Sequence, residues 1–176
     1  MKLLLACAGA AALAACSGTT MGAGGVTEMA ADATPNDAPT YVAMAGSSDL
    51  YEIESSRLAL QRAPSAAVKQ FAQMMIDHHT MTTQQVTQAV QAAGMTPPPP
   101  SLLPPQRAML DALQPASGAA FERLYVEQQR TAHRMALGLH QNHARNGDTA
   151  QLRQAASGAV PVVRRHIDHL AHLSPT

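Results

Sequence analysis

Residues Phe71–Met81, which read F-A-Q-M-M-I-D-H-H-T-M, combine an acid, two adjacent histidines and three methionines in an apolar periodic pattern. At about 100° per residue, one apolar stripe of a helix runs through this stretch. It consists of Val68, Ala72, Met75, Thr82, Val86 and Ala93. His78 and His79 flank the stripe, whereas Asp77 points to the opposite side. The pattern predicts a helix over residues 65–93 whose histidines face the interior or its margin.

A preceding helix is predicted to start within residues 37–40, with Pro39 acceptable in its first turn, and to end near Arg62. Its inward line contains Tyr41, Ala45, Ser48, Glu52, Ser56 and Ala59. Glu52 lies at the centre of this face, among small residues that leave room for another side chain or an ion. Because an ionised carboxylate is costly to bury alone, Glu52 is predicted to have a partner.

Two more helices are predicted in the C-terminal half, over residues 117–145 and 148–173. The core face of the first consists of Phe121, Leu124, Tyr125, Gln128, Ala132, Met135 and Leu139. His133 lies about 100° from this face, so we expect it at the boundary of the core. In the last helix His166 lies in the middle of the apolar stripe, and Pro161 predicts a kink or a split.

The four predicted helices are each about 22 to 30 residues long, and no segment shows the alternation of a strand. Prolines 97–100, followed by Pro104, Pro105 and Pro115, prevent a tight hairpin between the second and third helices. The sequence therefore predicts an all-α four-helix bundle with a long crossover between helices 2 and 3 and a kinked helix 4. An extended coiled coil is disfavoured because the inward faces are broad and the loops contain helix breakers.

Residues 1–15 resemble a bacterial lipoprotein signal peptide. Lys2 precedes an apolar run too short to span a bilayer, and Leu13-Ala14-Ala15-Cys16 is similar to a lipobox. The resemblance implies cleavage before Cys16, lipidation of that residue and a flexible tether over residues 16–36, ahead of a domain at 37–173. Ser17 implies sorting to the periplasmic face of the outer membrane. The alternative is an ordinary secretory signal with a coincidental cysteine.

Composition excludes several classes of function. Cys7 leaves with the signal and Cys16 carries lipid, so disulfides, thiolate metal sites and cysteine nucleophiles are excluded. The chain has 12 basic and 12 acidic residues and no tryptophan, which provides no footprint for nucleic acid. Eight histidines and ten methionines are the unusual content, and these are metal-ligand types. Met75 and Met135 lie on core stripes, where methionine more often indicates packing than copper binding.

An ordered set of motifs resembles the DUF4142 family of ferritin-like, mostly exported bacterial proteins of uncharacterised function. The motifs are Glu52-x6-Ala59, Phe71-Ala72-x4-Asp77-His78, Ser117-Gly118-x2-Phe121-x3-Tyr125, His133 and Val160-Pro161-x4-His166. Glu122 and Val160 depart from the family's usual Asp and Leu. The resemblance implies the fold and export, and it carries the family's recurring polar positions to Glu52, Asp77, His78, Tyr125, His133 and His166. Separately, Met-Met-Ile-Asp-His-His is similar to a helix of the DUF305 family, for which metal binding has been proposed.

One interpretation is a metal site inside the bundle. Glu52, His78, His133 and His166 would converge as ligands for Zn, Cu or Fe, with Tyr125, Asp77 and His79 supporting them. Glu52 and His166 are expected to be buried and to interact directly or through a bridge. Dedicated di-iron chemistry is disfavoured because neither of the two helices that carry His78 and His166 has the Glu-x-x-His spacing.

The alternative is that the same Glu, His and Tyr side chains form a buried hydrogen-bond network with a purely structural role. The protein would then be a non-enzymatic envelope stress or interaction protein with an unidentified protein partner. Catalysis is disfavoured in either case, since no Ser-His-Asp arrangement, phosphate-binding loop or nucleophile elbow is visible. The partner that the sequence does predict is the membrane, through the lipid at Cys16.

Overall fold

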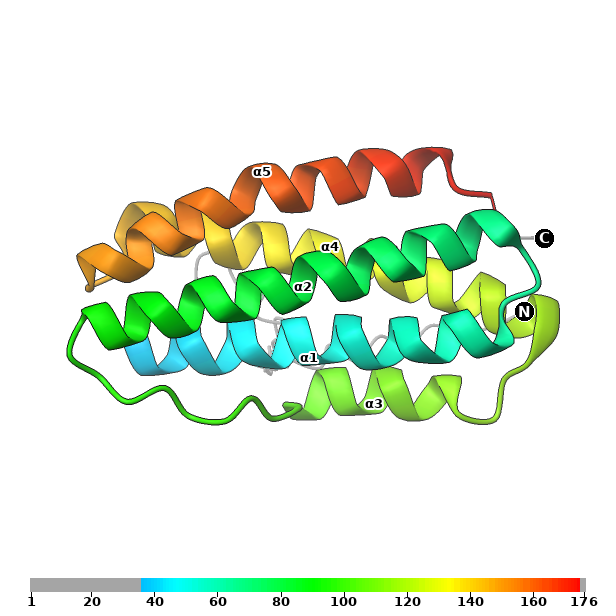
Figure 1. The fold of residues 1–176 in the computed structure, drawn as a ribbon, viewed down its shortest axis with the longest axis horizontal. Helices are drawn as coiled ribbons and strands as arrows, with labels where there is room; N and C mark the ends of the chain where they lie inside the picture. The colour runs from blue at the N-terminus through cyan, green and yellow to red at the C-terminus, as the bar shows by residue number, and fades with distance from the viewer. Residues whose placement is uncertain (1–35, 175–176) are drawn as a thin grey trace, which may run out of the picture. The chain divides into compact units, whose positions relative to one another are not determined.

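The computed structural model describes residues 36–174, and within that range all regular structure is helical (Figure 1). The helices are α1 (Ala38–Arg62), α2 (Ala66–Ala92), α3 (Pro104–Leu113), α4 (Gly118–Asn146) and α5 (Ala150–His172). The predicted signal peptide, Cys16 and almost all of the tether lie outside the described residues. Among the described helices, none has the length and apolarity that crossing a membrane requires.

Local sequence signals explain where the first two helices begin and end. The Asp37 carboxylate accepts a hydrogen bond from the Thr40 amide at 2.9 Å, which caps α1. The Ser65 hydroxyl caps α2 in the same way, through the amide of Val68. After α2 the chain turns at Gly94, whose φ of 75° suits a residue without a side chain. The predicted boundaries of α1, α2 and α4 agree with the structure to within about two residues.

The four long helices pack as neighbours in a ring of contacts. α1 packs against α2 and α4, and α5 packs against the same two helices. α3 lies along the outside of α1 and also contacts α4 (Figure 1). The connection between α2 and α4 is therefore long, as the prolines predicted, and it contains a helix of its own.

The sequence-based prediction of four helices omitted α3. This helix starts with Pro104 and Pro105, which are favourable in a first turn because the amide hydrogens there have no partner within the helix. Leu110 and Leu113 are buried and anchor α3 to its neighbours. The sequence-based prediction treats these prolines only as residues that prevent a hairpin, whereas in the structure Pro104 and Pro105 begin a helix.

Helix α5 continues without a break through Pro161. The predicted split at this proline is therefore wrong, and a kink there stays a prediction. The helix keeps its apolar face across the proline, with Ala159 and Val163 both buried.

Besides a small cluster around Tyr51, the interior of the described residues contains two larger apolar clusters. One contains Phe71, Met75, Phe121, Tyr125 and Leu170, and the other contains Tyr41, Val86, Leu139 and Leu152. Along each long helix, buried polar side chains occur between the residues of these two clusters. They include Asp49, Glu52, His79, Thr82, Gln129, His133 and His166. The fold thus places a polar layer in the middle of an apolar core.

Candidate metal centre

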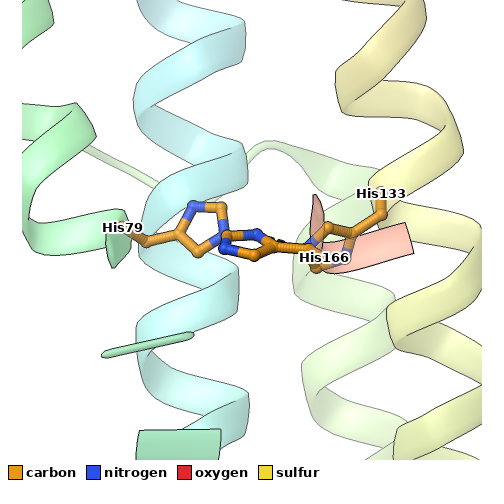
Figure 2. Close-up of side chains that lie close together, drawn as sticks. All are labelled: His79, His133 and His166. Atoms are coloured by element: carbon orange, nitrogen blue, oxygen red, sulfur yellow. Dashed lines mark hydrogen bonds between the residues drawn. The ribbon is translucent and has the colours of Figure 1, made fainter. Parts of the chain in front are cut away.

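Three histidines converge in the polar layer. His79 comes from α2, His133 from α4 and His166 from α5 (Figure 2). Each offers one ring nitrogen, and the three nitrogens lie within 4.8 Å of one another. The side chains are 4%, 1% and 1% exposed, respectively, so bulk water does not compete for the nitrogens. Within residues 36–174 this is the one group of three His, Cys, Asp or Glu residues with such a geometry.

A one-way chain of hydrogen bonds fixes the tautomers of two of these rings. His133 Nδ1 lies 2.8 Å from the carbonyl oxygen of Gln129, which can only accept, so Nδ1 carries the hydrogen. His133 Nε2 therefore accepts from His166 Nδ1, at 3.2 Å. His166 Nε2 in turn accepts from His78 Nδ1, at 2.7 Å. Every link in the chain is satisfied with neutral rings.

The third ring is held by Asp49 on α1. His79 Nδ1 lies 2.8 Å from Asp49 Oδ1 and donates to it. The other carboxylate oxygen accepts hydrogen bonds from Thr82 and Thr83, both at 3.0 Å. His79 Nε2 is buried and has no hydrogen-bond partner. The arrangement directs an unused ring nitrogen into the cluster and fixes the ring from behind, as carboxylates do for metal-binding histidines.

Burial controls the protonation of the cluster. It lowers the pKa of His133 to about 3 and that of His166 to about 2, and the neighbouring charge of His79 acts in the same direction. Both rings are therefore neutral at pH 7. His133 Nε2 has a lone pair, and His166 Nδ1 offers one to an ion once its hydrogen moves to Nε2, which then donates to His78 Nδ1. Burial also acts to lower the pKa of His79, but the hydrogen bond and the charge of Asp49 outweigh it, and the net shift is upward. His79 is the ring that would release a proton on binding a metal ion.

Glu52 is buried beside the cluster but is not one of the converging groups. Its Oε1 atom lies 3.6 Å from His133 Nδ1, on the far side of that ring from Nε2 and too far for a hydrogen bond. Its Oε2 atom is buried without a hydrogen-bond partner. Burial raises the pKa of Glu52 to about 7, so the carboxyl group is close to half protonated at neutral pH. Glu52 and His166 are both 1% exposed and are connected through His133 rather than directly.

The other residues predicted for the site lie at different distances from it. His78 is half-buried and hydrogen-bonds to His166, so it supports the cluster from its edge. Tyr125 is buried in the apolar cluster around Phe71, and its hydroxyl pairs with Ser56 at 2.8 Å. Asp77 is exposed and accepts a hydrogen bond from Gln73 on its own helix. The structure therefore places Asp77 on the surface, where the helical pattern also put it.

His78 was predicted as a ligand and His79 as a supporting residue, and the structure has the two reversed. The cause is geometric. The buried positions of α2 continue from Met75 through His79 and Thr82 to Val86, at steps of three and four residues. His79 thus lies on the inward stripe, and His78 lies at its side. The spacing itself distinguishes the pair, because His79 completes the steps of three and four and His78 does not. The sequence-based prediction placed both at the flanks of the stripe and missed this.

His133 was expected at the boundary of the core and is 1% exposed instead. The reason is that α4 contacts α1, α3 and α5, so it buries two faces rather than one. The second buried face includes Glu122, Gln129, His133 and His140. The sequence-based prediction assumed that α4 buries only one face, so it placed this row of polar residues at the boundary of the core.

Asp49 was not predicted as part of the site. It lies four residues after Ala45 and three before Glu52, so helical spacing places it on the inward face of α1. An acid at a position that the spacing marks as buried, opposite a histidine-containing helix, was the signal that could have identified it. The side chain is 5% exposed.

The donor set suits a transition-metal ion. Three neutral imidazoles are a common set for zinc, copper, iron and nickel, and they leave a coordination position open. The second ring nitrogen of each histidine has a hydrogen-bonding group in reach, which is Asp49 for His79, the Gln129 carbonyl for His133 and His78 for His166. The unpartnered Nε2 atom of His79 fits an ion as its missing partner.

Comparison with known proteins establishes the family of the chain. The family model for the domain of unknown function DUF4142 matches residues 24–173, so the protein belongs to the DUF4142 family. No curated protein matches the sequence.

Among solved structures, the fold is similar to that of CopM. The chain matches CopM in its Cu(II)-bound form with a TM-score of 0.63 and 19% sequence identity, over 77% of this chain and 94% of that chain. The Cu(I)-bound and Ag-bound forms of CopM match with TM-scores of 0.62 and 0.61 at the same identity, over 93% of their chains. At this level of identity the likeness concerns the helical fold.

Proposed function

We propose that this protein binds one transition-metal ion in its interior through His79, His133 and His166. The observation that carries the proposal is the convergence of three buried ring nitrogens whose opposite nitrogens each have a hydrogen-bonding partner. CopM, which shares the fold, has been solved with copper and with silver bound, and this supports a role in metal handling.

The ligand chemistry favours Cu(II) or Zn(II), with Fe(II) as a weaker candidate. Imidazole sites bind divalent first-row ions in an order that peaks at copper. Glu52 lies outside the converging group, so the site lacks the carboxylates on which di-iron proteins depend. The role is binding or delivery of an ion rather than catalysis.

The same proposal includes the setting of the domain. The four long helices form a ferritin-like four-helix bundle, to which α3 is added on one side. Cys16 carries the lipid anchor, and the domain lies on the periplasmic face of the outer membrane. Cys16→Ser should release the protein from the membrane fraction or block processing. A variant of mature size that remains with membranes contradicts the anchor.

A second candidate role needs no ion. The chain from His78 through His166 and His133 to the Gln129 carbonyl is complete with neutral rings. Such a network can hold the register of α2, α4 and α5 without a ligand. The protein would then act in the envelope through a partner, and its stability would respond to these residues but not to chelators.

Calorimetric titration of tag-free protein at pH 7.5 with Zn(II), Cu(II) and Fe(II) separates the two roles. We expect wild type to bind one ion per chain, and His166→Ala to bind it at least about a hundredfold more weakly, because one of three ligands is lost. His172→Ala is the matched control, since His172 is exposed near the end of α5. His166→Gln, which keeps more of the volume, serves if the alanine variant does not fold.

Equal affinity in wild type and in the His166 variants would contradict the interior site. Loss of binding in His172→Ala would assign metal uptake to surface histidines instead. Circular dichroism of each variant without metal establishes that the helices are intact before the affinities are compared.

A further inference from the structure

A cavity lies between α1, α3 and α4, and none of the three converging histidines is among its lining residues. Its volume is about 100 Å³. Met44 from α1, Met109 from α3 and Met135 from α4 all line it, so each helix contributes one thioether. The remaining walls are mostly apolar and include Leu103, Pro105, Ala132, Ala136 and Leu139. We call this cavity the methionine pocket.

The three methionines of this pocket differ in how they pack: Met44 and Met109 pack against apolar clusters of the core, whereas Met135 does not. Met135 lies on a stripe of α4 that the sequence predicts to be core, yet its side chain is 49% exposed. Met44 and Met109 are half-buried. Met75, in contrast, is fully buried and fills the apolar core as expected. The core prediction for Met135 is therefore wrong, and packing does not explain why a thioether stands at that position.

The polar groups of the pocket offer lone pairs without charge. Gln106 lines the cavity, and its Oε1 atom is buried with no hydrogen-bond partner. Tyr51 also lines it, but its hydroxyl already donates to Gln128 at 2.9 Å. No acid, histidine or basic residue is among the lining side chains. The available uncharged donors are three thioethers, the Gln106 amide oxygen and the Ser48 hydroxyl.

These uncharged, mostly thioether donors favour soft monovalent ions over harder divalent ones. Thioethers are soft, polarisable ligands that suit Cu(I) and its analogue Ag(I), whereas Zn(II) prefers imidazole, thiolate and carboxylate. An uncharged pocket compensates the desolvation of a monovalent cation more readily than that of a divalent one. Methionine also has three rotatable bonds, so its side chain can adapt to the position of a bound ion.

We propose that the methionine pocket binds one monovalent soft ion, Cu(I) or Ag(I), through Met44, Met109 and Met135. The site is separate from the histidine cluster and does not depend on metal binding there. The chain would then hold two ions of different charge and softness at two places in one domain.

The test uses the full chain labelled with ¹³C in the methionine methyl groups, with Ag(I) as a probe that has no redox chemistry. Zn(II) is added in excess first, so that imidazoles are occupied where they bind it. We expect Ag(I) to shift the methyl signals of Met44, Met109 and Met135 together, at one ion per chain. The signals of Met74 and Met95, which lie outside the pocket, should not move.

The matched variants are Met44→Leu/Met109→Leu/Met135→Leu and the control Met95→Leu. Leucine conserves the volume of methionine and is well tolerated in packed positions, which a melting curve of each variant verifies. The triple variant should bind Ag(I) at least about tenfold more weakly by calorimetry, with the control unchanged. Full Ag(I) affinity in the triple variant, or shifts confined to other methionines, would overturn the proposal. These readouts hold whether or not Zn(II) binds the histidines, so the two sites fail separately.

Discussion

The molecule buries histidines in two places, and the two arrangements differ in what their ring nitrogens can do. The first is the converging group of His79, His133 and His166. The second, which we call the end cluster, consists of Tyr41, His140 and His143, near the start of α1 and the end of α4. Here His143 stacks on Tyr41 with ring centroids 3.8 Å apart, and His140 Nδ1 lies 3.1 Å from the Tyr41 hydroxyl.

Burial alone does not distinguish the two clusters. It lowers the pKa of His140 to about 4 and also lowers the pKa of His143, as it does for His133 and His166. The difference is in geometry. The nitrogens of the first group converge and are fixed from behind, whereas both nitrogens of His143 are buried without any hydrogen-bond partner. A metal site therefore requires oriented lone pairs, and a low histidine pKa is not sufficient.

The largest change in stability is expected from replacing the buried carboxylate of Glu52. One carboxylate lies beside each histidine cluster: Glu52 beside the converging group and Asp148 beside the end cluster. Glu52 is unpaired at Oε2, whereas Asp148, beside the end cluster, accepts hydrogen bonds from the Ala38 amide and the Thr149 hydroxyl. Burial raises the pKa of Glu52 from 4.5 to about 7. The fold thus favours the protonated acid, and this contribution is complete below pH 4.5 and is lost as pH rises through about 7.

Glu52→Gln removes this pH dependence. In urea unfolding with chelator present, the stability of the variant relative to wild type should increase by about 2 to 3 kcal/mol between pH 5 and pH 8. Asp148→Asn, the matched change in the other region, should instead destabilise the protein by about 1 kcal/mol at both pH values. If Glu52→Gln tracks wild type across this range, the carboxylate is solvated or paired in solution.

A smaller effect, on metal affinity, is expected from replacing Asp49, the residue that orients His79. Asp49→Asn removes the charge that fixes the ring and should weaken metal binding by about ten- to a hundredfold, as changes behind metal-binding histidines commonly do. Competition with a chromophoric chelator at pH 7.5 measures the affinity. His143→Phe in the end cluster is the control and should leave it unchanged. Equal losses in both variants would indicate a general effect on folding.

Most of the helical scaffold could be predicted from the sequence because local signals repeat along it. Asp37, Ser65 and Gly94 mark helix ends by capping and turn chemistry, and the apolar stripes have helical period. The omission of α3 shows the limit, since proline both ends and begins helices. Which role it takes depends on whether the residues after it, such as Leu110 and Leu113, find a surface to cover.

The site was predicted less completely because it depends on how many neighbours each helix has. His133 and His166 were identified, but His79 and Asp49 acquire their roles from contacts between α1 and α2 that are remote in sequence. Periodicity gives the direction of one face at a time. It cannot show that α4 buries a second face. It does place His79 rather than His78 on the inward stripe of α2, which the sequence-based prediction missed.

The smallest predicted effect concerns His143, the member of the end cluster whose ring nitrogens make no hydrogen bond. His143 is fully buried, and neither Nδ1 nor Nε2 has a hydrogen-bond partner. A buried polar group without a partner costs about 1 to 3 kcal/mol, and replacing it with an apolar group of the same shape recovers part of this. Phenylalanine has a similar ring and can keep the stack on Tyr41. His143→Phe should therefore stabilise the protein by about 1 kcal/mol at pH 7.5 in urea unfolding.

The pH dependence of that gain identifies its cause. The pKa of His143 is lowered in the fold, so the stability that neutral His143 permits is present above the unfolded value of 6.5 and is lost as pH falls. The advantage of phenylalanine should accordingly grow below pH 6.5. His140→Phe is the contrasting variant, since it removes the hydrogen bond to Tyr41 and should destabilise the protein by about 1 kcal/mol. If His143→Phe also destabilises it, one of the two nitrogens is bonded in solution, and the end cluster is then a polar network like the first rather than its unsatisfied counterpart.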